Sequence, residues 1–125
     1  MRSLSSILLV LAISISCKSS SAQEVVRIDG QYIMDEVIGK EVQLVDVRSQ
    51  AEYKSGHIDD AVNMNVMDRK RFIQQIEALD KEEPVYLYCK SGVRSKNAAE
   101  LLKKEGFSKI FDYSGGYDDW KKSKR

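Results

Sequence analysis

The sequence predicts a single α/β domain with a mostly parallel, five-stranded sheet and helices on both faces. Short apolar runs rich in β-branched residues alternate with segments in which apolar residues recur at helical spacing. The run Val85–Tyr88 contains only Val, Tyr and Leu, which is typical of a strand buried on both faces of a parallel sheet. At 125 residues, with 42% hydrophobic and 31% charged residues, the chain has the length and composition of one globular domain.

Three strands and two short helices are expected in the first half of this domain. The strands cover residues 25–28, 42–47 and 61–64, the first of them as an edge strand. Asp29 is placed to cap a helix that runs through Ile38 and stops at Gly39, and Ser49 to cap a short helix over residues 51–54. Helices between consecutive strands act as crossover connections, so neighbouring strands are expected to run parallel.

Two further strands and three helices are expected in the second half. A helix over residues 68–79 places Phe72 and Ile76 one turn apart on its apolar face. The strand at 85–88 leads directly into Cys89, and a helix over residues 93–105 follows and ends at Gly106. The last strand covers residues 109–113, and a glycine turn then starts a final helix that carries Tyr117 and Trp120 as core residues.

The first 22 residues resemble a targeting segment rather than part of the domain. Arg2 precedes an apolar run at residues 7–13, which is the length of a signal-peptide hydrophobic region and too short to cross a bilayer. Cys17 follows in a context that resembles the lipobox of bacterial lipoproteins, in which the cysteine becomes the lipidated first residue. Cleavage after Ala22 is the alternative. We expect residues 1–22 to form a signal peptide and tether and residues 23–125 the domain, exported to the periplasm and anchored to a membrane only through lipid on Cys17.

Charge and cysteine content narrow the classes of function. There are 20 Lys and Arg residues against 19 Asp and Glu, a net charge of +1, whereas nucleic-acid-binding domains usually carry a basic surface, so no nucleic acid partner is expected. Two cysteines cannot build a disulfide scaffold. With Cys17 lipidated or removed, Cys89 is the only free thiol, and in an oxidising compartment such a thiol is either shielded or used. A small neutral domain of this kind is expected to be a monomer.

The segment Cys89–Ser95 is the strongest candidate for a functional site. Cys89 ends a buried strand and a helix starts within five residues, so the N–H groups of residues 90–95 can converge on one anionic point. These amides, the helix dipole and the cations of Lys90 and Arg94 favour a thiolate at Cys89. Gly92 permits the backbone conformation that a tight cradle requires. The pattern predicts a sulfur nucleophile that becomes a bound anion, because a purely structural cysteine does not explain the neighbouring cations and glycine.

Three motifs together resemble the signatures of single-domain rhodaneses. The loop Cys89–Ser95 is similar to the family's Cys-x-x-Gly-x-Arg-Ser/Thr. Upstream, the family signature is matched by Leu44–Arg48, Glu52-Tyr53, Gly56–Ile58 and Ala61–Asn63. Near the end, Gly115–Trp120 resembles the closing Gly-Gly-x-x-x-Trp. The motifs follow one another in the family's order from Leu44 to Trp120, which is most of the domain.

The resemblance implies a small rhodanese-like domain with sulfurtransferase chemistry and no metal or organic cofactor. Cys89 as thiolate would take the outer sulfur of a small anionic donor such as thiosulfate as a persulfide and pass it to a thiophilic acceptor. That acceptor is a cyanide-like molecule, a small thiol or a protein thiol. The substrate-binding loop would consist of Lys90, Ser91, Gly92, Val93, Arg94 and Ser95, with Lys90 and Arg94 orienting the donor. Asp46 and Arg48 are supporting residues that pair with each other or brace the loop.

Other functions remain open from the sequence. A rhodanese-like binding module would present the same loop to a protein partner without turnover, and a periplasmic persulfide or thiol relay would use Cys89 toward a protein acceptor. A related cysteine phosphatase is disfavoured, because its phosphate cradle needs a longer loop than the four residues that separate Cys89 from Arg94. His57 is the single histidine and is expected to be structural rather than a catalytic base.

Overall fold

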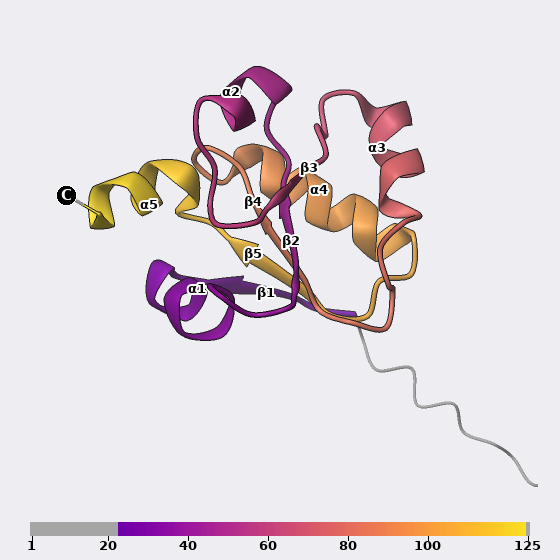
Figure 1. Cartoon of the computed structure of the whole chain (residues 1–125). Helices are drawn as coiled ribbons and strands as arrows, with labels where there is room; N and C mark the ends of the chain where they lie inside the picture. Colours follow the sequence, from indigo (N-terminus) through magenta and orange to yellow (C-terminus); the bar gives the residue numbers. More distant parts are fainter. Residues whose placement is uncertain (1–22, 125) are drawn as a thin grey trace, which may run out of the picture.

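The computed structural model describes residues 23–124 as five strands and five helices that alternate along the chain (Figure 1). The strands are β1 (Val25–Ile28), β2 (Gln43–Asp46), β3 (Val62–Asn63), β4 (Val85–Tyr88) and β5 (Ile110–Tyr113). The helices are α1 (Gly30–Glu36), α2 (Gln50–Lys54), α3 (Arg69–Ile76), α4 (Val93–Lys104) and α5 (Gly116–Ser123). The predicted signal peptide and Cys17 lie outside the described residues.

All five strands form one parallel sheet in the order β1-β5-β4-β2-β3. The first and last strands lie side by side, because β1 pairs with β5 from Val25 opposite Ile110 to Ile28 opposite Tyr113. The strand that precedes Cys89, β4, is central, between β5 and β2. Since every strand runs in the same direction, their carboxyl ends meet at one edge of the sheet, which is where ligands bind in open α/β folds.

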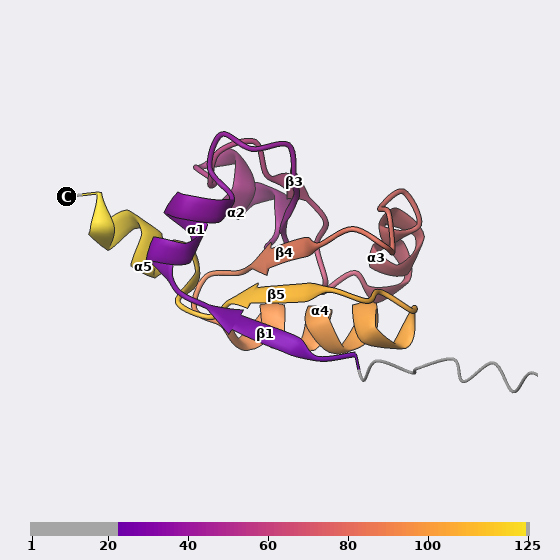
Figure 2. The same cartoon turned by 90° about the horizontal axis from the view of Figure 1, so that it is seen from below.

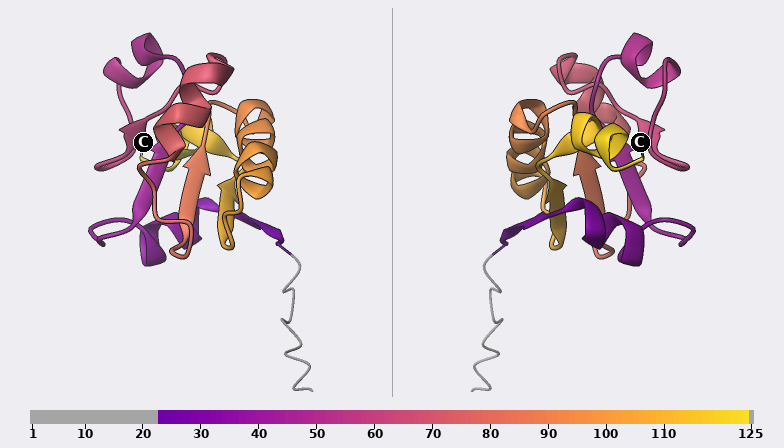
Figure 3. Two further views of the ribbon diagram at one scale, coloured as in Figure 1. Left: turned by 90° about the vertical axis from the view of Figure 1, so that its right-hand side faces the viewer. Right: turned by 90° about the vertical axis from the view of Figure 1, so that its left-hand side faces the viewer.

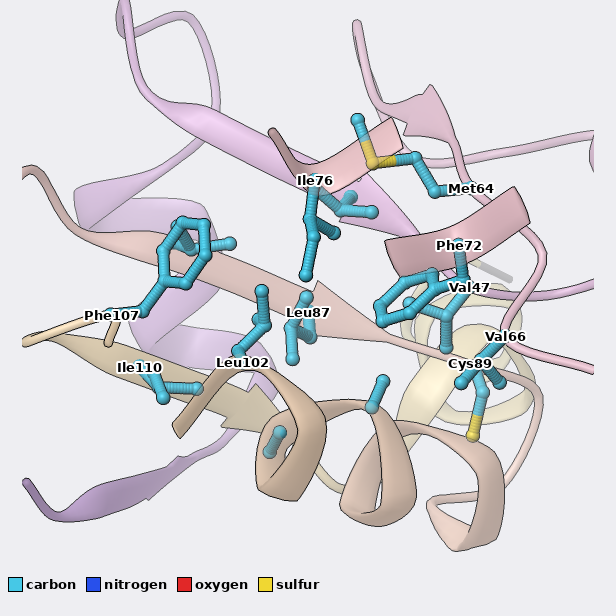
Figure 4. Close-up of a cluster of buried hydrophobic side chains, with 14 residues drawn as sticks. Val47, Met64, Val66, Phe72, Ile76, Leu87, Cys89, Leu102, Phe107 and Ile110 are labelled. Atoms are coloured by element: carbon cyan, nitrogen blue, oxygen red, sulfur yellow. The ribbon is translucent and has the colours of Figure 1, made fainter. Parts of the chain in front are cut away.

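Helices cover both faces of the sheet and enclose two apolar clusters (Figures 2 and 3). On one face α3 and α4 pack over β4, with Phe72, Leu87 and Leu102 among the buried residues (Figure 4). On the other face α1 and α5 supply Ile33 and Trp120 to the second cluster. Successive residues of β4 point into the two clusters in turn, and all four are buried, as a central strand of a two-faced sheet requires.

Helices α1, α2 and α3 begin where a short polar side chain accepts a hydrogen bond from an N–H group of the first turn. The Asp29 carboxylate caps α1 by accepting from the N–H of Tyr32 at 2.9 Å. Ser49 and Glu52 form a capping box at α2, in which each side chain accepts from the other residue's N–H at 3.3 Å. The start of α4 differs, because its N-cap is Gly92, with φ of 101° and no side-chain cap. No side chain caps the N–H groups at the start of α4, so they are available to bind an acceptor in the candidate site.

The predicted fold class is confirmed, and each predicted strand and helix is present with some ends shortened. The strand expected at 42–47 is limited to Gln43–Asp46. The helix expected to continue to residue 79 ends at Ile76, because the N–H groups of Ala78 and Leu79 donate to carbonyls three residues back and tighten the chain into a turn. Between residues 23 and 124, none of the helices has the length and apolar character needed to cross a membrane.

Candidate active site

The candidate site lies at the carboxyl edge of the sheet, where β4 ends and α4 begins. Cys89 follows β4 directly and is 1% exposed, as a member of the apolar cluster beneath α3 and α4. Figure 4 shows its sulfur pointing toward the first turn of α4. The rigid central strand thus fixes the position of the sulfur, while the loop of residues 90–95 provides its polar surroundings.

Backbone amides and one hydroxyl surround this sulfur. The N–H of Gly92 donates to Cys89 Sγ at 3.0 Å, and Ser95 Oγ lies 3.5 Å from the sulfur. Burial acts to raise the pKa of Cys89, but hydrogen bonds from the Ser95 hydroxyl and from the N–H groups of Ser95, Gly92 and Ser91 outweigh it and lower the pKa below its usual value. The loop favours a thiolate mainly through hydrogen bonds rather than through the neighbouring cations.

Gly92 is required at its position for both conformational and spatial reasons. Its φ of 101° lies in the region that residues with a side chain rarely adopt. A Cβ at this position would lie 2.5 Å from the carbonyl oxygen of Ser114, which follows β5. The loop can therefore aim the Gly92 N–H at the sulfur only because no side chain is present.

The first turn of helix α5 is hydrogen-bonded to the backbone of the cysteine loop. The N–H of Tyr117 donates to the carbonyl of Cys89 at 2.8 Å, and the N–H of Asp118 donates to the carbonyl of Lys90 at 3.1 Å. Gly116 permits this approach, because its φ is 67° and a Cβ there would lie 2.6 Å from the carbonyl oxygen of Cys89. The glycine motif near the end of the chain thus acts directly on the cysteine loop.

Both cations of the loop are paired with carboxylates. Arg94 donates to both oxygens of Glu52, at 2.6 and 2.9 Å, and this pair holds the pKa of Glu52 at about 2. Lys90 Nζ donates to Asp118 Oδ2 at 2.9 Å in an exposed pair. The sequence identified the two cations as donor-orienting groups but neither of their partners. The loop is therefore less positive than its own sequence implies.

Asp46 and Arg48 form a buried ion pair at the end of β2. Arg48 Nε donates to the two Asp46 oxygens at 3.0 and 3.1 Å, and Nη2 donates to Oδ2 at 2.7 Å. Nη2 also donates to the carbonyl of Gly56 at 2.7 Å, and the guanidinium lies 4.2 Å from the ring centre of Tyr117. The expected pairing is present. The pair also braces the loop, because Tyr117 donates its N–H to the carbonyl of Cys89.

The other residues singled out by the sequence lie around this centre. Ser91 and Val93 are exposed, Val93 by 78%, and Ser91 acts on the sulfur through its N–H. His57 stacks on Tyr53 with ring centres 3.9 Å apart, and its Nδ1 lies 3.1 Å from the Tyr53 carbonyl oxygen. No histidine is among the groups that act on the Cys89 sulfur. The structural interpretation of His57 agrees with this placement.

Sequence reasoning identified Asp46 but assigned no role to three other acidic residues, Glu52, Asp112 and Asp118. The spacing of Ser49 and Glu52 is a local signal for a capping box, but nothing local indicates that Glu52 also binds Arg94, 42 residues further on. Asp118 shows only as a polar residue inside the closing motif. Asp112 sits in a strand that pattern reading treats as apolar, yet it is 1% exposed. Long-range contacts of this kind are set by the fold.

A cavity of about 410 Å³ opens beside the loop. Its lining includes Arg48, Glu52, Lys90, Tyr117, Asp118 and Lys121. Charges of both signs therefore face it, and Lys90 is the member of the cysteine loop that lines it. Over residues 23–124, no cluster of three or more His, Cys, Asp or Glu side chains is arranged to hold a metal ion.

Comparison with known proteins places this site in a family. Residues 30–123 match the rhodanese-like domain. Over 81 residues, 65% of this chain and 77% of the relative, the sequence is 37% identical to thiosulfate sulfurtransferase GlpE of Shewanella oneidensis. Over 82 residues, 66% of this chain and 74% of the relative, it is 32% identical to the protein of the same name from Coxiella burnetii.

Solved structures agree with the observed fold. A rhodanese-like domain protein from Staphylococcus aureus superposes with a TM-score of 0.68 at 27% identity, covering 77% of this chain and 91% of that one. The human single-domain sulfurtransferase TSTD1 gives a TM-score of 0.66 at 22% identity, covering 79% and 97%, and at this identity it shows the fold alone. Because the match includes the sheet from β2 onward, the cysteine loop and α5, the chain belongs to the rhodanese-like domain family.

Proposed function

We propose that this chain is a sulfurtransferase in which Cys89 carries the transferred sulfur. The observation that carries the proposal is the cradle around Cys89 Sγ, with the Gly92 N–H at 3.0 Å and Ser95 Oγ at 3.5 Å, which favours an anionic sulfur at this point. The lowered pKa of Cys89 supports a thiolate nucleophile. The relatives named thiosulfate sulfurtransferase support sulfur as the transferred group and thiosulfate as the donor.

The proposed reaction consists of two displacements at sulfur. The Cys89 thiolate attacks the outer sulfur of thiosulfate, a new sulfur–sulfur bond forms, and the donor's own sulfur–sulfur bond breaks with its electron pair leaving on sulfite. The loop amides stabilise the resulting persulfide anion as an oxyanion hole stabilises oxygen. Cyanide or a thiolate then attacks the outer sulfur, and the Cys89 thiolate leaves with the electron pair of the broken bond.

Lys90 is the cation that we expect to orient the donor. Its ion pair with Asp118 is exposed and therefore weak, so the oxygens of an anionic donor can replace the carboxylate. Lys90 also lines the cavity beside the loop. Arg94 is held by two hydrogen bonds to Glu52, an arrangement that suits support of the loop better than exchange with a substrate.

A persulfide relay to a protein thiol is the second candidate. Val93, 78% exposed in the first turn of α4, offers an apolar contact close to Cys89 that a small anionic donor does not need.

For both the enzyme and the relay, incubation with thiosulfate should leave Cys89 one sulfur atom heavier by mass spectrometry. Turnover with cyanide would favour the enzyme, and a persulfide that only a protein thiol discharges would favour the relay. An unmodified Cys89 would instead favour a binding module that does not transfer sulfur.

The deciding experiment is thiocyanate formation from thiosulfate and cyanide. The full-length chain is compared with Cys89→Ser and, as a matched control, with Cys17→Ser, because these are the two cysteines of the sequence. We expect activity in the wild type and in Cys17→Ser and none in Cys89→Ser. Activity that survives Cys89→Ser, or no activity in a folded wild type with reduced Cys89, would contradict the small-molecule enzyme.

We further propose that the protein is exported and anchored to a bacterial membrane through lipid on Cys17. The proposal rests on the apolar run at residues 7–13 and on the position of Cys17 directly after it. Fractionation in a bacterial host, with the mass of the mature N-terminus, tests it. A membrane-bound protein that starts at acylated Cys17 and is released by Cys17→Ala is expected. A soluble periplasmic protein that starts at Gln23 would support the alternative cleavage after Ala22.

A further inference from the structure

We propose that Asp118, in the first turn of α5, is a positioning residue that sets how strongly the cysteine loop prefers an anionic partner over a neutral one. It does so by holding the ammonium group of Lys90. This role deepens the proposed function and rests on it for the identity of the donor. A direct ion pair, a main-chain contact and a shared cavity support it.

Asp118 contacts the cysteine loop twice. Its Oδ2 accepts a hydrogen bond from Lys90 Nζ at 2.9 Å, and its N–H donates to the carbonyl of Lys90 at 3.1 Å. The N–H is free for this contact because it belongs to the first turn of α5, where N–H groups have no acceptor within the helix. The main-chain bond therefore keeps the carboxylate within reach of Lys90, although the two residues are 28 positions apart.

Lys90 is the cation of the loop that a ligand can reach. Its side chain is 57% exposed and that of Asp118 is 33% exposed, and both residues line the cavity of about 410 Å³ beside the loop. Arg94, by contrast, is held by two hydrogen bonds to Glu52. An anion that approaches Cys89 therefore depends on Lys90 for charge attraction, and the Asp118 carboxylate already occupies this cation.

The ion pair can open without leaving Asp118 in an unfavourable place. Exposed ion pairs are weak, because water and salt screen the charges. A carboxylate released from Lys90 remains at the start of α5, where the helix dipole favours negative charge, and Lys121 and Lys122 of the same helix also attract it. The hydrogen bond from Lys90 lowers the pKa of Asp118, so the group is an anion at neutral pH. Asp118 is thus a competitor that an incoming anion displaces.

This competition sets a preference because it affects only charged partners. An anionic molecule has to replace the Asp118 carboxylate before it gains the attraction of Lys90, whereas a neutral molecule makes no use of that cation. Without the charge of Asp118, anions should bind more tightly and neutral molecules equally well. The expected factor is about two to five, which is the effect of one exposed ion pair on a binding constant.

The test compares an anionic with a neutral alkylating reagent in the full-length chain carrying Cys17→Ser, so that Cys89 is its only cysteine. The same thiolate attacks iodoacetate and iodoacetamide, so the ratio of the two rates cancels any change in the pKa of Cys89. We expect Asp118→Asn to raise this ratio about two- to five-fold and Asp118→Glu to restore it. An unchanged or lowered ratio in Asp118→Asn, or one that stays high in Asp118→Glu, would overturn the proposal.

Glu83→Gln is the matched control for charge. It makes the same change in net charge at an exposed residue two positions before β4, at the opposite edge of the sheet from the cysteine loop. Its ratio of rates should equal that of the starting protein. A ratio raised as much as in Asp118→Asn would show that net charge, rather than the contact with Lys90, attracts the anionic reagent, and would contradict the proposal.

A Lys90→Gln background separates an effect through Lys90 from direct repulsion. Asp118→Asn should change the ratio there by less than half as much, on a logarithmic scale, as it does when Lys90 is present, because the two residues are coupled. An equal change in both backgrounds would show that the carboxylate repels anions without Lys90 and would overturn the proposal.

Binding of an inert anion provides a measurement that does not depend on the reactivity of Cys89. Sulfate, which has no sulfur atom to transfer, is titrated into the Cys17→Ser protein while the amide signals of the cysteine loop are followed by NMR. Asp118→Asn should lower its dissociation constant about two- to five-fold. An equal or higher constant, or no binding to either protein, would contradict the proposal. None of these measurements needs a sulfur donor, so a failure of sulfur transfer would count against the proposed function alone.

Discussion

At the scale of single residues, two opposing effects decide the state of Cys89. Its burial favours the neutral thiol, since a charged group loses its hydration there. The N–H of Gly92 and the hydroxyl of Ser95 favour the thiolate, and hydrogen bonds to an ionised acceptor are about twice as strong as those between neutral groups. The hydrogen bonds outweigh the effect of burial, so the pKa of Cys89 lies below its usual value. The lowered pKa therefore comes from the Ser95 hydroxyl together with backbone N–H donors.

Glu52 allows a pH-dependent test at the same scale. Its pKa is about 2 in the folded chain against 4.5 for an ordinary Glu, chiefly because of Arg94. The stabilisation is thus complete above pH 4.5 and is lost as the pH falls toward 2. Glu52→Gln keeps a capping-box side chain and removes the ion pair, and should lower the free energy of unfolding at neutral pH by about 1–2 kcal/mol. Denaturant unfolding of wild type and variant measures the difference, which should shrink at acid pH.

Glu36→Gln is the matched control for this prediction. Glu36, the last residue of α1, approaches Lys40 at 4.0 Å in an exposed pair, and its loss should change the unfolding free energy by less than about 0.5 kcal/mol. A Glu52→Gln protein as stable as Glu36→Gln at neutral pH, or a difference from wild type that stays constant into acid, would argue against a structural role of the Arg94 pair.

At the scale of elements, the site is a contact between the starts of two helices. The first turn of α4 directs its N–H groups at the sulfur, and the first turn of α5 directs two N–H groups at the carbonyls of Cys89 and Lys90. Helix starts have free N–H donors, so each turn can bind acceptors outside its own helix. The loop between β4 and α4 is held on both sides by such donors.

Gly116→Ala tests the contact between α5 and the loop. The new Cβ would meet the carbonyl oxygens of Cys89 and Lys90 at 2.6 and 2.5 Å, and φ is positive. We expect a loss of unfolding free energy of about 2–4 kcal/mol, from backbone strain and the displaced loop, and slower alkylation of Cys89. Gly106→Ala is the control, because Gly106 also has a positive φ but nothing within 4 Å of an added Cβ. Its cost should be about 1–2 kcal/mol with an unchanged alkylation rate. Equal effects of the two substitutions would contradict the contact.

At the scale of the whole molecule, Arg48 connects segments that are far apart in the sequence. It binds Asp46 at the end of β2, the carbonyl of Gly56 after α2 and the ring of Tyr117 in α5. Both members of the Asp46–Arg48 pair are buried. A buried charge that loses its partner costs more than the pair itself contributes.

Arg48→Met is expected to destabilise the protein by about 3–5 kcal/mol, because it leaves the Asp46 carboxylate buried and unpaired. Asp46→Asn added to Arg48→Met removes that charge and should restore part of the loss. Urea unfolding of the single and double variants measures both effects. If the double variant is no more stable than Arg48→Met, the desolvated charge is not the cause, and the contacts to Gly56 and Tyr117 dominate.

The fold class and the order of the elements were predictable from the amino-acid sequence, which also singled out the cysteine loop as the candidate site. This information is local: Val85–Tyr88 has the composition of a buried strand, and Cys89, Gly92 and Arg94 stand at a spacing typical of the family. Local patterns suffice here because strand burial, helix starts and a short anion-binding loop each depend on neighbouring residues.

The pairing of charges at the site depends on how the chain folds in three dimensions. Glu52 binds Arg94 across 42 positions, and Asp118 binds Lys90 across 28. No periodicity or spacing encodes these contacts, because they depend on which strands lie side by side and how the helices pack on them. The parallel order that places β5 beside β4 puts the buried Asp112 opposite Leu87, two residues before Cys89.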